Sequence, residues 1–153
     1  QDFCYNGLAV EVKTSKSNKP SRKISNEYQL DSAGLNELYV QFYKLNEYQG
    51  GSETLYSLIC GIREQLNSDI LIQFNEKLEI LGVNQETEKE YNNTSYSIGF
   101  ERTYHITASF PKIVRNNLVD ALSAVSYEID PKLCAEFETD ISLLFNHIIN
   151  GNN

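Results

Sequence analysis

Alternating apolar and polar side chains predict a β-strand near the start of the chain. In residues 8–14 (LAVEVKT), aliphatic side chains at every second position from Leu8 to Val12 alternate with a series that contains Glu11 and Lys13. Strand side chains point to opposite faces with a period of two. Glu11 and Lys13 should therefore emerge next to each other on one face, while the valines pack on the other.

Four further segments show strand patterns. Residues 3–5 should pair with residues 8–14 in a hairpin, because the Asn6-Gly7 dipeptide between them is favoured in tight hairpin turns. Residues 37–48 are rich in aromatic and β-branched types and predict a long strand. The remaining predicted strands cover residues 95–109 (a strand or hairpin) and 124–129.

Apolar positions three and four residues apart predict three helices. The first should begin after a cap at Ser52, the second should cover residues 68–81 and stop at Gly82, and the third should cover residues 131–151. We expect the second helix to turn inward Ile70, Leu71, Phe74, Leu78 and Leu81. We expect the third to pack through Leu133, Phe137, Ile141, Leu144, Phe145 and Ile148.

Polar segments predict the connections between these elements. Residues 15–23 and 84–93 read as loops, because they are polar and lack apolar periodicity. In residues 24–31, Ser25 or Asn26 would cap a short helical turn that ends near Asp31.

Composition indicates one domain of ordinary size. The chain has 153 residues, of which 41% are hydrophobic, enough to form a core. No run approaches the ~18 apolar residues of a membrane span, so we expect no membrane association. The three cysteines are widely spaced and form no zinc-binding pattern, so they predict buried, reduced thiols and a cytoplasmic location.

Charge is distributed unevenly along the sequence. The formal net charge is -8, which by itself argues against a general nucleic-acid binder. The residues between Lys13 and Lys23 nevertheless include five basic ones and no acidic one. Basic side chains in one loop can bind a phosphate backbone, although a solvated surface loop is the simpler interpretation. The candidate DNA-binding residues in this loop are Lys16, Lys19, Arg22 and Lys23.

The start of the chain resembles the signature of the PD-(D/E)xK nuclease superfamily. Asp2 is followed nine residues later by Glu11-Val12-Lys13, with a hairpin turn between them, although Gln1 stands where the family usually has Pro. The segments LAVEVKTS, ISNEYQLD, SFPKI, VSYEID and LCAEF also resemble a bacterial family of PD-(D/E)xK motif proteins. This similarity covers nearly the whole chain.

The resemblance implies a restriction-endonuclease-like α/β fold, with a mixed β-sheet flanked by helices and a C-terminal helix and strand extension. We expect a single domain over residues 1–153, with a catalytic core in 1–48 and a family-specific extension in 52–153. Because the family normally has a helix and an outer strand before the Asp, we also expect this chain to be a fragment.

The same resemblance implies a hydrolytic site. Asp2, Glu11 and Lys13 would be the catalytic residues, with Mg²⁺ (or Mn²⁺) held by Asp2, Glu11 and the Val12 backbone carbonyl. Carboxylates suit such a hard cation, and Lys13 would orient the attacking water and stabilise developing charge. Gln29 is an accessory candidate, either near the site or as a solvated polar residue.

The implied activity is Mg²⁺-dependent hydrolysis of DNA phosphodiester bonds. Relatives are often encoded beside restriction or phage-defence genes, so the expected partners are DNA, a second copy of the chain and other defence proteins. Two alternatives stay open: an inactive nuclease-fold domain that binds DNA or a partner protein, and an interaction domain without nucleic acid. In either case Glu11 and Lys13 would be an ordinary pair on a strand edge and Asp2 a frayed terminus.

Overall fold

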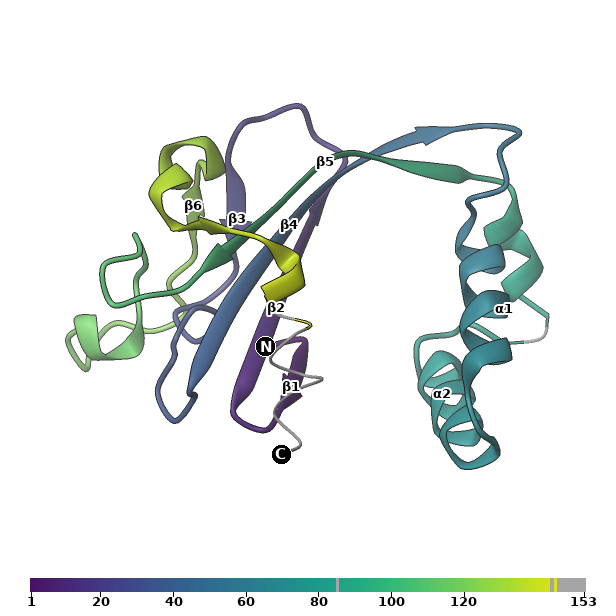
Figure 1. Cartoon of the computed structure of the whole chain (residues 1–153), viewed down its shortest axis with the longest axis horizontal. Helices are drawn as coiled ribbons and strands as arrows, with labels where there is room; N and C mark the ends of the chain where they lie inside the picture. The colour runs from purple at the N-terminus through teal and green to yellow at the C-terminus, as the bar shows by residue number, and fades with distance from the viewer. Residues whose placement is uncertain (85, 144, 146–153) are drawn as a thin grey trace. The chain divides into compact units, whose positions relative to one another are not determined.

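The computed structural model describes residues 1–84, 86–143 and 145, and its elements are labelled in Figure 1. The strands are β1 (Phe3–Tyr5), β2 (Leu8–Ser15), β3 (Arg22–Ile24), β4 (Glu37–Tyr48), β5 (Ser95–His105), β6 (Tyr127–Ile129) and β7 (Glu138–Thr139). The helices are α1 (Leu55–Gln65) and α2 (Ser68–Ile80), with short 3₁₀ helices η1 (Glu88–Asn92), η2 (Arg115–Asn117) and η3 (Pro131–Phe137).

The strands form a five-stranded mixed sheet and a separate pair. The order in the larger sheet is β1-β2-β4-β5-β7, in which β1 and β2 are antiparallel and β2 and β4 are parallel. The smaller sheet pairs β3 with β6. The predicted α/β class with a mixed sheet is confirmed.

The chain divides into two compact units. The sheet unit contains residues 1–44 and the chain from residue 99 onward, and the helical unit contains residues 45–98. The division falls within β4 and within β5. It differs from the expected split into a core over 1–48 and an extension over 52–153, because β6 and β7 join the unit that holds the first strands. The single-domain assignment stays a prediction.

The core of the sheet unit is built on both faces of β4. Leu38, Val40 and Phe42 belong to the main cluster of buried residues, and Tyr39 packs on the opposite face with Leu8 and Val10 of β2. A strand buried on both faces is typical of parallel pairing. The two faces of β2 are also separated as predicted, since Ala9 lies in the main cluster while Leu8 and Val10 lie in the other.

The predicted hairpin is present and its turn is connected to β4. Asn6 and Gly7 both have positive φ angles, 48° and 80°, as the tightest hairpin turns require. The Gly7 carbonyl accepts hydrogen bonds from the backbone N–H groups of Asn36 and Glu37, at 2.8 Å and 3.3 Å. A Cβ at position 7 would lie 2.6 Å from Asn36 Nδ2, an atom at the end of a side chain that can move, so the positive φ is the main reason for glycine here.

The segment after β2 differs from its prediction. Residues 22–24, predicted as loop, form β3 because they pair with β6, with Arg22 opposite Ile129 and Ile24 opposite Tyr127. Residues 25–31 form turns and no helix. Asn26 closes one of these turns, its Oδ1 accepting from the Tyr28 N–H at 2.9 Å.

Buried Glu27 fixes these turns to a distant part of the chain. Its carboxylate accepts hydrogen bonds from the N–H groups of Ala124 and Val125, at 3.3 Å and 3.0 Å. Together with the N–H of Glu27 itself, whose hydrogen bond has the largest effect, these donors lower the pKa of the carboxyl group. Ala124 has a positive φ of 55°, so the predicted strand over 124–129 is shortened to β6.

The predicted helix over 131–151 is wrong in its first half. Asp130 caps η3 by accepting from the Lys132 N–H, and Cys134 within it has non-helical backbone angles. β7 follows directly and pairs with β5, and helical residues resume only at 141. Phe137 packs on the main core, but Leu133 is 82% exposed. The expectations for Leu144, Ile148 and Gly151 lie outside the described residues.

The predicted helices in the helical unit are confirmed, with two corrections. Thr54, and not Ser52, caps α1 in a reciprocal arrangement with Ser57, with hydrogen bonds of 3.0 Å and 2.9 Å. α2 has no fully buried residue, but its half-buried positions are Leu71, Phe74 and Leu78, which belong to the predicted inward face. Ile70 and Leu81 do not follow the prediction, because they are 44% and 75% exposed.

The cysteines follow their prediction only in part. All three are free thiols, but Cys134 is buried, Cys60 is half-buried and Cys4 is exposed. Among the described residues, no helix combines the length and apolar character that crossing a membrane requires.

Candidate functional site

The hairpin brings Asp2 close to β2. β1 and β2 are antiparallel with Phe3 opposite Val10, and the Asp2 N–H donates to the Val10 carbonyl at 3.1 Å. The backbone of Asp2 is thus bonded to Val10, and the regular pairing of the hairpin ends at Phe3.

Glu11 is a buried carboxylate with a cationic neighbour. The residue is 2% exposed, and Lys13 Nζ lies 2.7 Å from its Oε1. A buried charge is costly unless it is paired, and here the pairing comes from the same strand two residues later. The predicted neighbourhood of Glu11 and Lys13 is thus present.

Asp2 is exposed, but its carboxylate is held in place. Asp2 Oδ2 accepts a hydrogen bond from the Val12 N–H at 2.7 Å. The carboxylate therefore lies against the peptide unit between Glu11 and Val12. The structure therefore places Asp2 against Val12 and Glu11 against Lys13. The catalytic and ligand roles of these residues remain predictions.

The donors at this site suit a hard cation. Two carboxylates and a peptide carbonyl offer oxygen atoms only, and Mg²⁺ is commonly bound through one or two carboxylates while it keeps several waters. In the part of the chain that the structure describes, no group of three or more His, Cys, Asp or Glu residues could hold a metal. The residues therefore fit Mg²⁺ or Mn²⁺ better than a metal that prefers imidazole or thiolate ligands.

A cavity extends from Lys13 along the basic loop. Its volume is about 290 Å³, and it is lined by Lys13, Lys19, Lys23 and one carboxylate, Glu128. Lys19 and Lys23 are exposed, and so is Lys16 in the same loop. The predicted basic segment therefore offers cations next to the carboxylate pair, where a phosphate backbone would need them.

Arg22 differs from the other basic residues of this segment. It belongs to β3 and is only 7% exposed, and its guanidinium NH1 donates to the carbonyls of Lys19, Ser21 and Pro20 at 2.6, 3.0 and 3.4 Å. The expectation of an exposed loop residue is therefore corrected, because pairing with β6 takes Arg22 inside. Its NH1 group shapes the loop that carries the other cations.

Gln29 is engaged within its own turn. Gln29 Oε1 accepts from the Ser25 N–H at 2.7 Å, so the amide oxygen closes the turn. Gln1 reaches the same turn, donating to the carbonyls of Tyr28 and Asp31 at 3.3 Å and 3.1 Å. A hydrogen bond thus connects the residue before Asp2 with the turn that carries Gln29. The accessory role of Gln29 remains a prediction.

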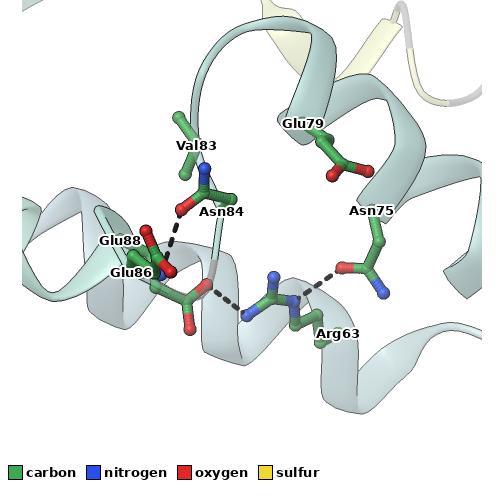
Figure 2. Close-up of a pocket in the computed structure, with 7 residues that line it drawn as sticks. All are labelled: Arg63, Asn75, Glu79, Val83, Asn84, Glu86 and Glu88. Carbon is green, nitrogen blue, oxygen red and sulfur yellow. Dashed lines mark hydrogen bonds and ion pairs between the residues drawn. The ribbon is translucent and has the colours of Figure 1, made fainter.

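The helical unit has a larger cavity of a different kind, drawn in Figure 2. Its volume is about 590 Å³, and three Glu residues line it. Arg63 Nε donates to Asn75 Oδ1 at 2.9 Å, and Arg63 NH1 lies 2.8 Å from Glu88 Oε2. The guanidinium is thus used to join α1 to α2 and η1. This network accounts for Arg63 and Glu88 without a ligand.

Three residues that the sequence did not single out contribute to a further cavity in the sheet unit: Lys44, Phe100 and Lys132. Each lies far along the chain from the basic loop. Lys44 sits near the end of a strand pattern, and Lys132 follows a proline in a segment predicted as a helix. The local sequence carries no signal that would bring the three together.

Comparison with known families gives one match. A family model described as "Putative PD-(D/E)XK family member, (DUF4420)" matches residues 1–131. The match includes the hairpin, the basic loop and the sheet strands through β6. Searches of curated proteins and of solved structures found no match.

Proposed function

Because the chain belongs to this PD-(D/E)XK family, we propose that it is a Mg²⁺-dependent endonuclease that hydrolyses phosphodiester bonds in DNA. The observation that carries the proposal is the contact of both acids with neighbouring positions of β2: the Asp2 carboxylate accepts from the Val12 N–H at 2.7 Å, and Lys13 Nζ lies 2.7 Å from the buried Glu11 carboxylate. A basic cavity begins at Lys13.

Each residue has a definite task in this proposal. Asp2 and Glu11 would hold Mg²⁺, which when bound lowers the pKa of water and offsets negative charge on the phosphate. Lys13 would place its ammonium against a phosphate oxygen and stabilise the charge that develops there. The Val12 N–H keeps the Asp2 carboxylate in position, so the exposed acid is oriented before substrate arrives. Lys16, Lys19 and Lys23 would contact backbone phosphates without reading sequence.

A plasmid-nicking assay with the full chain in Mg²⁺ tests the activity. We expect Asp2→Asn, Glu11→Gln and Lys13→Ala each to lower the cleavage rate by about 10²–10³-fold, the usual effect of losing one charge-stabilising group. Glu76→Gln and Lys89→Gln are matched controls in the helical unit and should cleave like wild type. Because Asp2 is exposed, Asp2→Asn should fold normally even if Glu11→Gln does not.

The same assay separates the alternatives. Cleavage by the Asp2→Asn variant at the wild-type rate would contradict the proposed site. DNA binding without cleavage in any divalent metal would instead indicate an inactive nuclease-fold domain. A gel shift over a salt series decides whether DNA is involved at all, since phosphate contacts lose affinity steeply as salt rises.

The biological setting proposed here is bacterial restriction or phage defence in the cytoplasm. It rests on the resemblance of the sequence to proteins encoded in such gene clusters. Cutting both strands usually takes two such sites, so we also propose a homodimer on DNA. Sedimentation with and without a duplex tests the dimer, and phage plating on cells that carry wild type or Asp2→Asn tests the defence role.

A further inference from the structure

The sheet unit has a second basic cavity, which shares Lys19 and Arg22 with the cavity at Lys13 but does not include Lys13. It has a volume of about 170 Å³ and lies between the loop at residues 17–20, Lys44 of β4, Phe100 of β5 and Lys132 of η3. We infer that this cavity is a binding pocket for a terminal phosphate group, separate from the carboxylate pair. Phosphate binding requires no cleavage, so the inference goes beyond the proposed function.

Cations dominate the walls of the pocket. Lys19, Arg22, Lys44 and Lys132 line it, and none of the described residues that line it is acidic. The chain as a whole has a net charge of -8, but no carboxylate among the lining residues offsets the positive charge of these four side chains. The cavity in Figure 2 shows the contrast, because its Arg63 is paired with Glu88. An anion would complement the smaller pocket.

Arg22 supplies the most specific sign of a missing acceptor. Its NH1 group is engaged by loop carbonyls, but the buried Nε has no hydrogen-bond partner. A buried N–H donor without an acceptor is costly, and such groups are rare in folded proteins. Guanidinium donors match the oxygens of a phosphate well. Arg22 also lines the pocket, but its Nε atom is enclosed, so a phosphate oxygen would satisfy this donor only if the groups around it move.

The other walls fix the loop and limit the size of the ligand. Lys44 Nζ donates to the Lys16 carbonyl, so this ammonium is held at the loop. One face of Phe100 is covered by the Arg102 guanidinium, 5.6 Å from the ring centre. The volume is below the ~300 Å³ of a typical small-molecule site. The pocket therefore suits one phosphate with part of its sugar, and is too small for a base pair.

The balance of charge favours a terminal phosphate over a backbone diester. A monoester carries up to two negative charges near neutral pH, whereas a diester carries one. The phosphate could belong to the 5′ end of a DNA strand or to a free nucleotide. Both present the same group to Arg22 and Lys132, so the experiment must separate them.

Calorimetric titration of the full chain tests the pocket. The probes are inorganic phosphate and thymidine 5′-monophosphate, and the variants are Lys132→Glu and Lys44→Gln, with Lys89→Gln as the matched control. We expect each probe to bind the Lys89→Gln control with the same affinity as wild type. Lys132→Glu should bind each probe at least about tenfold more weakly. Lys132 is exposed, so its substitution should leave the fold intact.

A competition experiment identifies the source of the phosphate. If a 5′-phosphorylated single strand displaces thymidine 5′-monophosphate better than the same strand with a 5′-hydroxyl, the ligand is a DNA end. If both strands compete equally weakly, the ligand is a free nucleotide. The absence of binding by all probes at millimolar concentration, or equal binding by wild type and Lys132→Glu, would overturn the inference. Asp2→Asn should bind phosphate like wild type. Phosphate binding can therefore be tested whether or not the nuclease proposal holds.

Discussion

In the sheet unit β4 is buried on both faces, whereas in the helical unit α2 has no buried residue among the positions described. The two units are therefore stabilised differently. Apolar burial dominates the first and allows it to enclose the charge of Glu11, which is only 2% exposed. The second buries fewer apolar side chains, such as Ile59 and Val83, and is also held by hydrogen bonds and an ion pair that join its helices. A precise charged site needs the first kind of support, because the surrounding packing holds it in one geometry.

The largest expected effect comes from the core of the sheet unit. Phe42 is fully buried and packs edge to face on Tyr104, with ring centres 5.8 Å apart. Phe42→Ala should lower the free energy of unfolding by about 3–5 kcal/mol through lost burial and a cavity. Denaturant unfolding measures the change. A loss below 1 kcal/mol would show that apolar burial does not dominate the stability of the sheet unit.

The next effect is a pH dependence that arises at Tyr104 in the sheet unit. Burial, with a smaller contribution from Glu138, raises the pKa of Tyr104 from 10.0 to about 12. Above pH 10 the unfolded chain loses this phenolic proton first, so folding stability should fall between pH 10 and 12, by about 2–3 kcal/mol. Stability is unaffected by this group below pH 10.

Tyr104→Phe is the control for that pH dependence. It loses the hydrogen bond from the Tyr104 hydroxyl to the Pro131 carbonyl, 2.8 Å long, but has no proton to release. Thermal melts from pH 9 to 12 should show a smaller decline for the variant than for wild type. Parallel curves would mean that the phenol titrates normally.

The third effect tests the hydrogen-bonded network of the helical unit. Arg63→Ala removes the contacts to Asn75 and Glu88 and should cost about 1–3 kcal/mol, because it leaves polar partners without a donor. Hydrogen exchange should accelerate in residues 55–92 and stay unchanged in β2 and β4. Faster exchange throughout the chain would show that the units unfold together.

The smallest effect is expected on the surface of α2. Ile72 is 58% exposed, so Ile72→Ser should change stability by less than about 0.5 kcal/mol. Ile59 of α1 is 3% exposed and provides the matched comparison, with a loss of about 2–4 kcal/mol expected for Ile59→Ala. A large loss for Ile72→Ser would mean that another surface covers this helix.

The sequence predicted well those features that depend on neighbouring residues. The Asn6-Gly7 turn and the period of two in β2 are local signals, and together they set the hairpin that brings the Asp2 carboxylate to Val12. The hairpin that carries the proposed site was therefore predictable, because its residues are close in the sequence. The long strand β4 was predictable for the same reason.

Features set by distant contacts were not predictable. β3 forms because Arg22 and Ile24 meet β6 more than a hundred residues later, and no local pattern announces this pairing. The short strand β7 interrupts a helical periodicity because it pairs with β5. The phosphate pocket depends on Lys44 and Lys132 as well as the basic loop, so its parts come together only in the folded chain.

The bond between the Gly7 carbonyl and the start of β4 has a consequence at a distance. It fixes which residue of β2 lies beside which residue of β4, beginning with Leu8 beside Glu37. A shift of this alignment by a single position would turn Glu11 and Lys13 to the opposite side of the sheet, because strand side chains alternate. A residue without a side chain therefore determines the orientation of the acid and the amine, although it touches neither.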